Sequence, residues 1–369
     1  MRRSTSGARP RLIDRVFPEA PVRQYVLSLP FALRYRLAYD RELCSQVLCI
    51  SVQTVFSSLR RRARKILRMR KAYCGSVTFL QRAGGSINLN PHYHSLVLDG
   101  VYVSSVPCEA PRFHPLPPPT DQEIARITAA IARRVEKLLE KRGLSGDDAP
   151  AGPDPLEADQ PLLTQLYAAS VQGRIATGPR AGRRTLRLGD RVDAEDVETR
   201  AGPRCASVQG FSLHADVCVP SRDRRRLERL CRYVARPPIA TERLSEAPDG
   251  RILYRLRHRW RDGTTHVVFD PLDLVARLAA LVPPPRASQP ADPHRLFWGI
   301  APRQGRRPAR SGADQATHRC AIGGSLGRNF GAVCSPWTPS NAIAAEGGCE
   351  SWQPSISPMR SAASSTAWA

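Results

Sequence analysis

The sequence lacks several patterns that would place it in a common class of protein. None of its ten cysteines forms a Cys-x-x-Cys pair, which excludes a zinc ribbon and a thioredoxin-like redox motif. No glycine-rich phosphate-binding loop occurs, so nothing indicates a nucleotide-dependent enzyme. The N-terminus carries arginines without an apolar core behind them, and no run approaches the roughly 18 apolar residues of a membrane span. We therefore expect a cytoplasmic protein with reduced thiols.

Lysine is scarce, whereas positive charge is abundant. Only four of the 56 basic residues are lysines, yet the formal net charge is +23 and the pI is near 10.6. Such a balance suits a polyanion, and nucleic acid is the expected partner. Alanine and proline are abundant as well, so GC-rich coding also explains part of the arginine excess.

Two histidines, His92 and His94, flank Tyr93 in a stretch that is typical of a β-strand. Alternate side chains of a strand share a face, so both imidazoles can bind one cation. The turn signal Asp99-Gly100 separates this stretch from a second β-rich run, which predicts a hairpin with the histidines at the edge of a small sheet. Taken alone, the pattern arises easily by chance, and two ordinary sheet histidines are then the more frequent explanation.

The rest of the chain alternates between strand-like and helical segments. The spacing of apolar residues predicts strands at 24–30, 76–81, 208–219, 251–256 and 264–269, and helices at 38–69, 120–142, 162–171, 221–235 and 270–281. The strand at 76–81 and the one bearing the histidines, joined by a Gly-rich connection, fit an antiparallel meander. The prediction is an α+β fold, with a mostly antiparallel sheet and flanking helices.

Composition divides the chain into regions. Residues 1–20 form a basic N-terminal tail, and residues 21–286 hold the segments with regular periodicity. Within these, residues 143–206 include a cluster of Asp, Pro and Gly and are interpreted as a linker or insertion. Residues 287–369 are rich in Pro, Ser, Gly and Ala without periodicity, which predicts a largely disordered C-terminal tail.

A tyrosine stands among arginines on the helix predicted from Ser221 to Ala235. Tyr233 falls on the flank of the apolar stripe of this helix, and Arg222, Arg226 and Arg229 lie close to it on the same face. Guanidinium groups bind phosphate oxygens, so a tyrosine beside them can approach a phosphodiester. A half-buried tyrosine at the rim of a domain is the alternative explanation, and the helix alone favours it.

The two features together predict one reaction. A cation held by His92 and His94 can polarise a phosphodiester. A tyrosine such as Tyr233 can then displace one side of it, which forms a phosphotyrosine and frees a sugar hydroxyl. This chemistry needs no nucleotide cofactor.

Several further residues are candidates for the same site. Gln81 or Asp99 could complete the metal shell, although the alternative of a polar strand end explains Gln81 slightly better. His214, on the strand before the tyrosine helix, either enters the site or is a satisfied sheet histidine. Arg236, beside Pro237, either touches phosphate or merely ends the helix.

Three sequence blocks in this order resemble those of a known family: Gln24–Pro30, Asn88–His94 and Leu230–Ala240. They look like the rolling-circle insertion-sequence transposases, called two-tyrosine transposases, of the His-hydrophobic-His (HUH) endonuclease superfamily. The resemblance covers roughly residues 20–286 and implies an HUH endonuclease-like fold. It also implies an enzyme that uses Mg²⁺ or Mn²⁺, nicks single-stranded DNA at element ends, stays attached to the 5′ end through tyrosine and later rejoins strands.

The resemblance also assigns roles to residues. It implies that His92 and His94 are metal ligands and that Tyr233 is the nucleophile. Members with two tyrosines carry the second one a helical turn earlier, where this chain has Arg229, so the chain resembles the single-tyrosine branch. The family usually begins with a cysteine-rich zinc-binding segment, of which residues 1–20 would be a remnant.

Two other functions stay open. A truncated, catalytically inactive transposase remnant would bind DNA in a salt-sensitive way and form no covalent adduct. A metal-dependent hydrolase of small substrates would use the histidine pair and would not need Tyr233.

Overall fold

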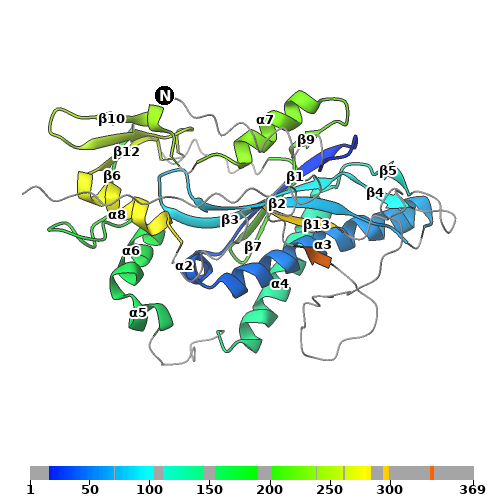
Figure 1. Ribbon diagram of the computed structural model, residues 1–369, viewed down its shortest axis with the longest axis horizontal. Coiled ribbons are helices and arrows are strands. Elements are labelled where there is room, and N and C mark those ends of the chain that lie inside the picture. Colours follow the sequence, from blue (N-terminus) through cyan, green and yellow to red (C-terminus); the bar gives the residue numbers. More distant parts are fainter. Residues whose placement is uncertain are drawn as a thin grey trace, which may run out of the picture. The chain divides into compact units, whose positions relative to one another are not determined.

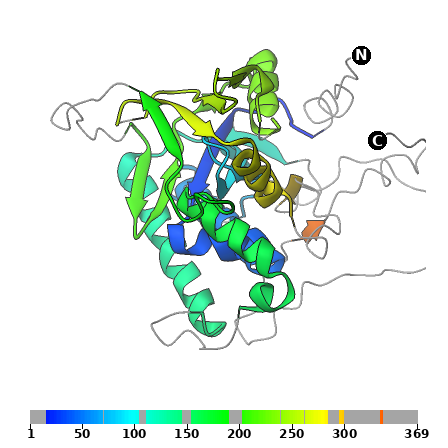
Figure 2. The ribbon, with the colours of Figure 1, turned by 90° about the vertical axis from the view of Figure 1, so that its left-hand side faces the viewer.

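The computed structural model describes most of the chain up to residue 283 and two short strands beyond it (Figures 1 and 2). Every described residue lies within Met1–Pro336, the first of the two units into which the chain divides. Most of the predicted N-terminal and C-terminal tails lies outside the described residues. These residues are 16–69, 71–103, 111–144, 154–189, 202–237, 239–260, 262–283, 294–298 and 333–335.

An antiparallel sheet carries most of the strands, in the order β14-β13-β2-β3-β1-β8-β7, and β9 also pairs with β1. The predicted α+β fold is confirmed, and so is the meander, because β2 and β3 pair antiparallel across a short Gly-containing turn. The strands are β1 (Val22–Ser28), β2 (Gly75–Ala83), β3 (Leu89–Leu98), β7 (Cys205–Val208), β8 (Phe211–His214), β9 (Cys218–Val219), β13 (His294–Trp298) and β14 (Val333–Ser335).

The strand with the histidines is central, and the prediction of a hairpin at the sheet edge is wrong. β3 pairs with β1 on one side and with β2 on the other, so neither of its edges is available to the next strand. The chain turns away at Asp99, whose backbone N–H donates to the carbonyl of Pro21. The next strand, β4 (Gly100–Val103), therefore pairs with β5 (Arg112–Pro115) in a separate two-stranded sheet.

Helices cover both faces of the main sheet (Figure 1). The face that carries Tyr93 packs against α3 (Arg41–Leu67) and α4 (Asp121–Lys141), and the opposite face packs against α7 (Arg224–Val234). The predicted helix at 38–69 is in fact two, α2 (Phe31–Tyr39) and α3, because Asp40 is extended and caps α3. By length and composition α3 could cross a membrane, but 56% of its apolar window is buried inside the protein, as in the central helix of a folded domain.

A second, four-stranded sheet has the order β10-β11-β12-β6. Together with α5, α6, α8 and the end of α2 it encloses its own hydrophobic core, which the turn between β2 and β3 also enters through Ile87. The segment predicted as a linker supplies α5, α6 and β6 to this region, and whether it is an insertion stays a prediction. The elements are β6 (Leu186–Gly189), β10 (Leu244–Glu246), β11 (Ile252–Arg255), β12 (Thr264–Phe269), α5 (Pro155–Asp159), α6 (Pro161–Gln172), α8 (Pro271–Leu281) and the 3₁₀ turn η3 (Thr241–Arg243).

A buried ion pair joins β1 to the end of β3. The Arg23 side chain is 3% exposed and that of Asp99 is 6% exposed, and their closest nitrogen and oxygen lie 2.6 Å apart. Arg23 also donates through Nη1 to the carbonyl of Ala215, at 2.9 Å. The Asp99 carboxylate is thus engaged in a structural contact, which argues against its predicted role in the metal shell.

Removing Arg23 should destabilise the fold strongly. Arg23→Met leaves the Asp99 carboxylate buried without its partner, and we expect the free energy of unfolding to fall by about 3–5 kcal/mol in urea titrations. The double variant Arg23→Met/Asp99→Leu should recover most of this loss, because neither charge is then buried alone. Equal losses in the single and double variants would contradict this account.

Candidate active site

The two histidines share a face of β3, as the alternation of strand side chains predicted. Their ring centroids are 4.9 Å apart, with an angle of 60° between the planes. In the sheet register His92 lies opposite Ser28 of β1 and Gln81 of β2. Side chains paired in this way project from one face, so Gln81 is the immediate neighbour of His92.

The hydrogen bond of His92 fixes which ring nitrogen is free to bind a cation. Its Nδ1 lies 2.7 Å from the backbone oxygen of Asn90. A carbonyl oxygen can only accept, so Nδ1 carries the proton and the lone pair is left on Nε2. Burial lowers the pKa of His92, the bond to Asn90 opposes this, and the positive charge of Arg34 lowers the pKa further. His92 is therefore held neutral, as a metal ligand must be.

His94 has a buried nitrogen without a partner. The residue is 4% exposed, and its Nε2 makes no hydrogen bond in the structure described. Its Nδ1 lies 2.8 Å from the side-chain amide nitrogen of Gln24. Burial, with a smaller contribution from the charge of His92, lowers the pKa of His94 to about 3. An unsatisfied buried polar atom costs about 1–3 kcal/mol, so a ligand at Nε2 would relieve a real penalty.

The amide of Gln24 controls whether His94 can bind a cation. When the amide nitrogen faces Nδ1, it donates, and the imidazole proton resides on Nε2. When the amide oxygen faces Nδ1, it accepts the proton there, and Nε2 offers its lone pair. Gln24 is 4% exposed, so it is well placed to hold one orientation.

Helix α7 places Tyr233 over the histidines. Its buried residues pack against the sheet face that bears His94, and Tyr233 is half-buried beside them. The ring centroid of Tyr233 is 6.1 Å from that of His94, and the two planes are nearly perpendicular, at 82°. The two halves of the site predicted from distant parts of the sequence thus converge in space.

Gln81 connects the histidine row to the tyrosine helix. Its Nε2 donates to the backbone oxygen of Val234, at 2.8 Å, one residue after Tyr233. The side-chain oxygen is then the atom of Gln81 that could bind a cation. No group of three His, Cys, Asp or Glu suited to a metal exists in the described part of the chain. Two imidazoles with an amide oxygen and water do suit a divalent ion that accepts mixed N and O ligands.

Two guanidinium groups lie against the ring of Tyr233. The Cζ atom of Arg236 is 5.4 Å from the ring centroid, and that of Arg257 is 4.8 Å from it. Arg236 was a candidate from the sequence, whereas Arg257 was not, because it comes from the turn after β11 in the second sheet. Only the folded chain shows this contact.

Of the three arginines predicted to share the face of Tyr233, two lie on the helix and the third does not. Arg226 and Arg229 are exposed on α7. Arg222 precedes the helix, because Asp223 caps it by accepting from the backbone N–H of Arg226, at 2.8 Å. Arg222 is therefore an exposed residue of the preceding turn.

His214 shares the row of His94 but belongs to β8, with β1 between the two histidines. Val26 of β1 pairs with His94 on one side and with His214 of β8 on the other. The two histidines are thus separated by two strand spacings, about 10 Å. The alternative of an ordinary sheet histidine fits this position better.

Comparison with known proteins gives a family. A family model described as "Putative transposase" matches residues 75–290, more than half of the chain. The chain belongs to this transposase family. The matched range includes β2, β3 and α7, and so contains Gln81, both histidines and Tyr233. No curated protein and no solved structure matches the transposase. Membership of this family implies that the transposase binds DNA and points to a DNA-cleaving enzyme.

Acid should weaken the fold of the metal-free transposase through His94. Its pKa is 6.5 in the unfolded chain and about 3 in the fold, so the unfolded state binds the proton first as the pH falls. The contribution that the neutral His94 makes to the free energy of unfolding is complete above pH 6.5. It is lost as the pH falls towards 3, by up to about 1.4 kcal/mol per pH unit. The free energy of unfolding can be measured by urea titrations in chelator at several pH values. It should fall less steeply with falling pH in His94→Gln than in the unchanged protein. An unchanged slope would contradict this expectation.

Proposed function

We propose that the transposase cleaves and rejoins single-stranded DNA at the ends of its element through a covalent bond between Tyr233 and the 5′ phosphate. It would then be a single-tyrosine enzyme of the HUH type that works by a rolling-circle mechanism. The observation that carries the proposal is the position of the Tyr233 ring, 6.1 Å from that of His94. The unpartnered Nε2 of His94 supports it, since a binding atom is available beside the phenol.

His92 and His94 would bind Mg²⁺ or Mn²⁺ through their Nε2 atoms, with the side-chain oxygen of Gln81 as a third protein ligand. Such a cation, when bound, polarises a phosphodiester as a Lewis acid. The hydrogen bond with Asn90 holds His92 in the tautomer that binding requires, and His94 adopts it when the Gln24 amide turns its oxygen towards Nδ1. This donor set gives the protein a reason to keep a neutral, buried histidine that weakens the fold.

The reaction exchanges one phosphate ester bond for another. The phenol oxygen of Tyr233 attacks phosphorus, the bond from phosphorus to the 3′ oxygen breaks, and the phenol proton ends on the 3′ hydroxyl that leaves. No water or nucleotide is consumed, so a second 3′ hydroxyl can reverse the step and rejoin strands. Arg236 and Arg257, both beside the Tyr233 ring, would bind the phosphate oxygens. The exposed Arg226 and Arg229 would contact the DNA backbone on either side.

Incubation with labelled single strands from the element ends and Mn²⁺ tests the proposal. We expect a labelled band that survives denaturant, and a peptide containing Tyr233 that carries the nucleotide in mass spectrometry. Cleaved DNA without a covalent adduct, or an adduct on another tyrosine, would overturn the assignment.

A DNA-binding remnant without activity is the second candidate. The candidate site offers two imidazoles and an amide, and no group of three His, Cys, Asp or Glu gathers in the described part of the chain, which favours a weak metal site. Such a protein would bind single strands with a steep salt dependence and form no adduct at any Mn²⁺ concentration.

A further inference from the structure

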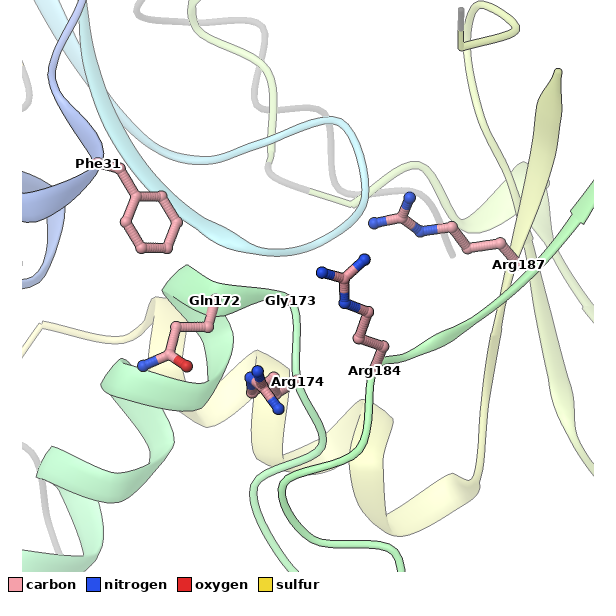
Figure 3. A pocket seen from close by; sticks show the side chains of 6 residues that line it. All are labelled: Phe31, Gln172, Gly173, Arg174, Arg184 and Arg187. Atoms are coloured by element: carbon pink, nitrogen blue, oxygen red, sulfur yellow. The ribbon is translucent and has the colours of Figure 1, made fainter. Parts of the chain in front are cut away.

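A basic pocket lies apart from the histidines and Tyr233, between the start of α2 and the strand β6. It has a volume of about 410 Å³ and is lined by Phe31, Gln172, Gly173, Arg174, Arg184 and Arg187. Figure 3 shows Arg184 and Arg187 extending into the space opposite the ring of Phe31. Three of the six lining residues are cationic and none is acidic, so the pocket suits an anion.

Two of the three positive charges in this pocket have no carboxylate partner among the described residues. Arg174 and Arg184 are bridged partners on neighbouring antiparallel segments, and like charges placed opposite one another are destabilising. Within the described residues, no carboxylate lies at ion-pair distance from either of them. Arg187 pairs with Asp262 at 3.3 Å, but both side chains are about half exposed, so a phosphate can replace this weak contact. Two of the three pocket arginines, Arg174 and Arg184, therefore lack a counter-ion among the described residues.

Aromatic rings accompany the arginines. Phe31 is 52% exposed although it is a large apolar residue, and the Arg34 guanidinium lies 5.7 Å from its ring centroid. Trp260 lies under Arg187, with the Cζ atom 4.7 Å from the ring centroid. Arginines that bind phosphates and exposed rings on which bases stack are the combination by which proteins hold single-stranded nucleic acid.

Two connections link the pocket to the candidate active site. On one side, Ser28 of β1 pairs with His92, and Phe31 follows three residues later. Arg34 on that first turn donates through Nε to the backbone oxygen of Leu29, which directly follows β1, at 3.1 Å. The pocket is thus reached from the histidines along the end of β1 and the first turn of α2.

On the other side, the turn between β11 and β12 provides the second connection. Its Arg257 lies against the ring of Tyr233, and its Trp260 lies against Arg187 of the pocket. A strand bound at Tyr233 can therefore follow this turn to the pocket. Arg257 lies at the end of this turn near Tyr233, and Trp260 lies at the end near the pocket.

We propose that this pocket binds one nucleotide of the single-stranded DNA that flanks the cleaved phosphodiester, with its base on Phe31 and its phosphate on Arg174, Arg184 and Arg187. The pocket volume is within the roughly 300–1,000 Å³ of small-ligand sites, which admits a nucleotide and excludes a duplex. The inference rests on the proposed function for the direction of the strand. Binding itself can be measured without cleavage.

The test measures binding of fluorescein-labelled oligothymidylate to the full chain by anisotropy, in chelator. Arg174→Ala/Arg184→Ala should weaken binding on the order of tenfold and make the salt dependence shallower by about 0.7 for each phosphate that the variant no longer binds. Phe31→Ala should weaken it by about 5- to 150-fold, the range for removal of one base stack, and Phe31→Trp should restore it. On an abasic strand the arginine effect should remain and the Phe31 effect should vanish.

The matched control is Arg126→Ala/Arg133→Ala, which removes the same charge from the exposed side of α4, on the other face of the sheet. An equal loss in this control, or an equal loss on duplex DNA, would overturn the proposal, and so would unchanged binding in the pocket variants. Because no metal is present, a failure of the transposase to form an adduct leaves this result intact. Conversely, adduct formation with unchanged binding would refute only the pocket.

Discussion

Tyr233→Phe should abolish the covalent protein–DNA adduct. The substitution removes one oxygen atom and keeps the ring that contacts His94, Arg236 and Arg257. Cleavage by the proposed route has no other nucleophile, so we expect the rate to fall by about 10⁴-fold or more, as when nucleophiles are removed from other enzymes. Quantification of the denaturant-resistant band over time measures this loss.

The specificity of this result depends on two comparisons. Tyr102→Phe removes a hydroxyl from another half-buried tyrosine, on β4, and should leave adduct formation unchanged. Affinity of the Tyr233→Phe variant for single strands should match that of the unchanged protein, because arginines supply most of the attraction. Persistence of the adduct in Tyr233→Phe would refute the role of this residue.

Replacement of His94 should remove metal-dependent cleavage, on the order of a hundredfold or more, while the fold remains. His94→Leu fits the apolar surroundings formed by Val77, Phe79 and Leu96. It eliminates the unpartnered Nε2 but also takes the partner from the buried Gln24 amide. Because these two effects oppose each other, the metal-free variant should melt near the temperature of the unchanged protein. Addition of Mn²⁺ should raise the melting temperature of the unchanged protein and not that of the variant. If His94 served only the stability of the fold, His94→Leu would melt at a clearly lower temperature and Mn²⁺ would affect both proteins alike.

Two further variants place this result in the site. His92→Ala should also lose metal-dependent cleavage, with little change in DNA affinity measured in chelator. Gln24→Met should weaken Mn²⁺ binding about 10- to 100-fold, because a metal-ligating ring then loses the partner that fixes its proton. If His94→Leu, His92→Ala and Gln24→Met all bound Mn²⁺ as tightly as the unchanged protein, the cation would have to lie elsewhere.

Local patterns in the sequence were enough to locate the main parts of the site. Alternation along β3 places His92 and His94 on one face, and the apolar stripe of α7 places Tyr233 at the margin of a buried surface. Both inferences need only the geometry of a single strand or helix, which neighbouring residues largely determine. The helix predicted at 120–142 is confirmed as α4 for the same reason.

Contacts between distant segments could not be predicted in this way. The hairpin expected after Asp99 does not form, because β1 and β2 already occupy both edges of β3, a fact of pairing rather than of local pattern. Arg257 reaches Tyr233 only because the second sheet folds back towards α7. The role of Gln24 likewise depends on the register between β1 and β3. Once that register is known, the alternation of side chains between the two faces of the sheet places Gln24 on the same face as His94.

The contact between Arg257 and Tyr233 has a consequence for shortened copies of the element. A gene interrupted after Arg236 would still encode six strands of the main sheet (β1, β2, β3, β7, β8 and β9), both histidines and the tyrosine, yet its product would lack β13, β14 and the Arg257 cation beside the Tyr233 ring. Defective derivatives of this kind should compete for the ends of the intact element while processing them slowly, so they would act as natural repressors of its spread.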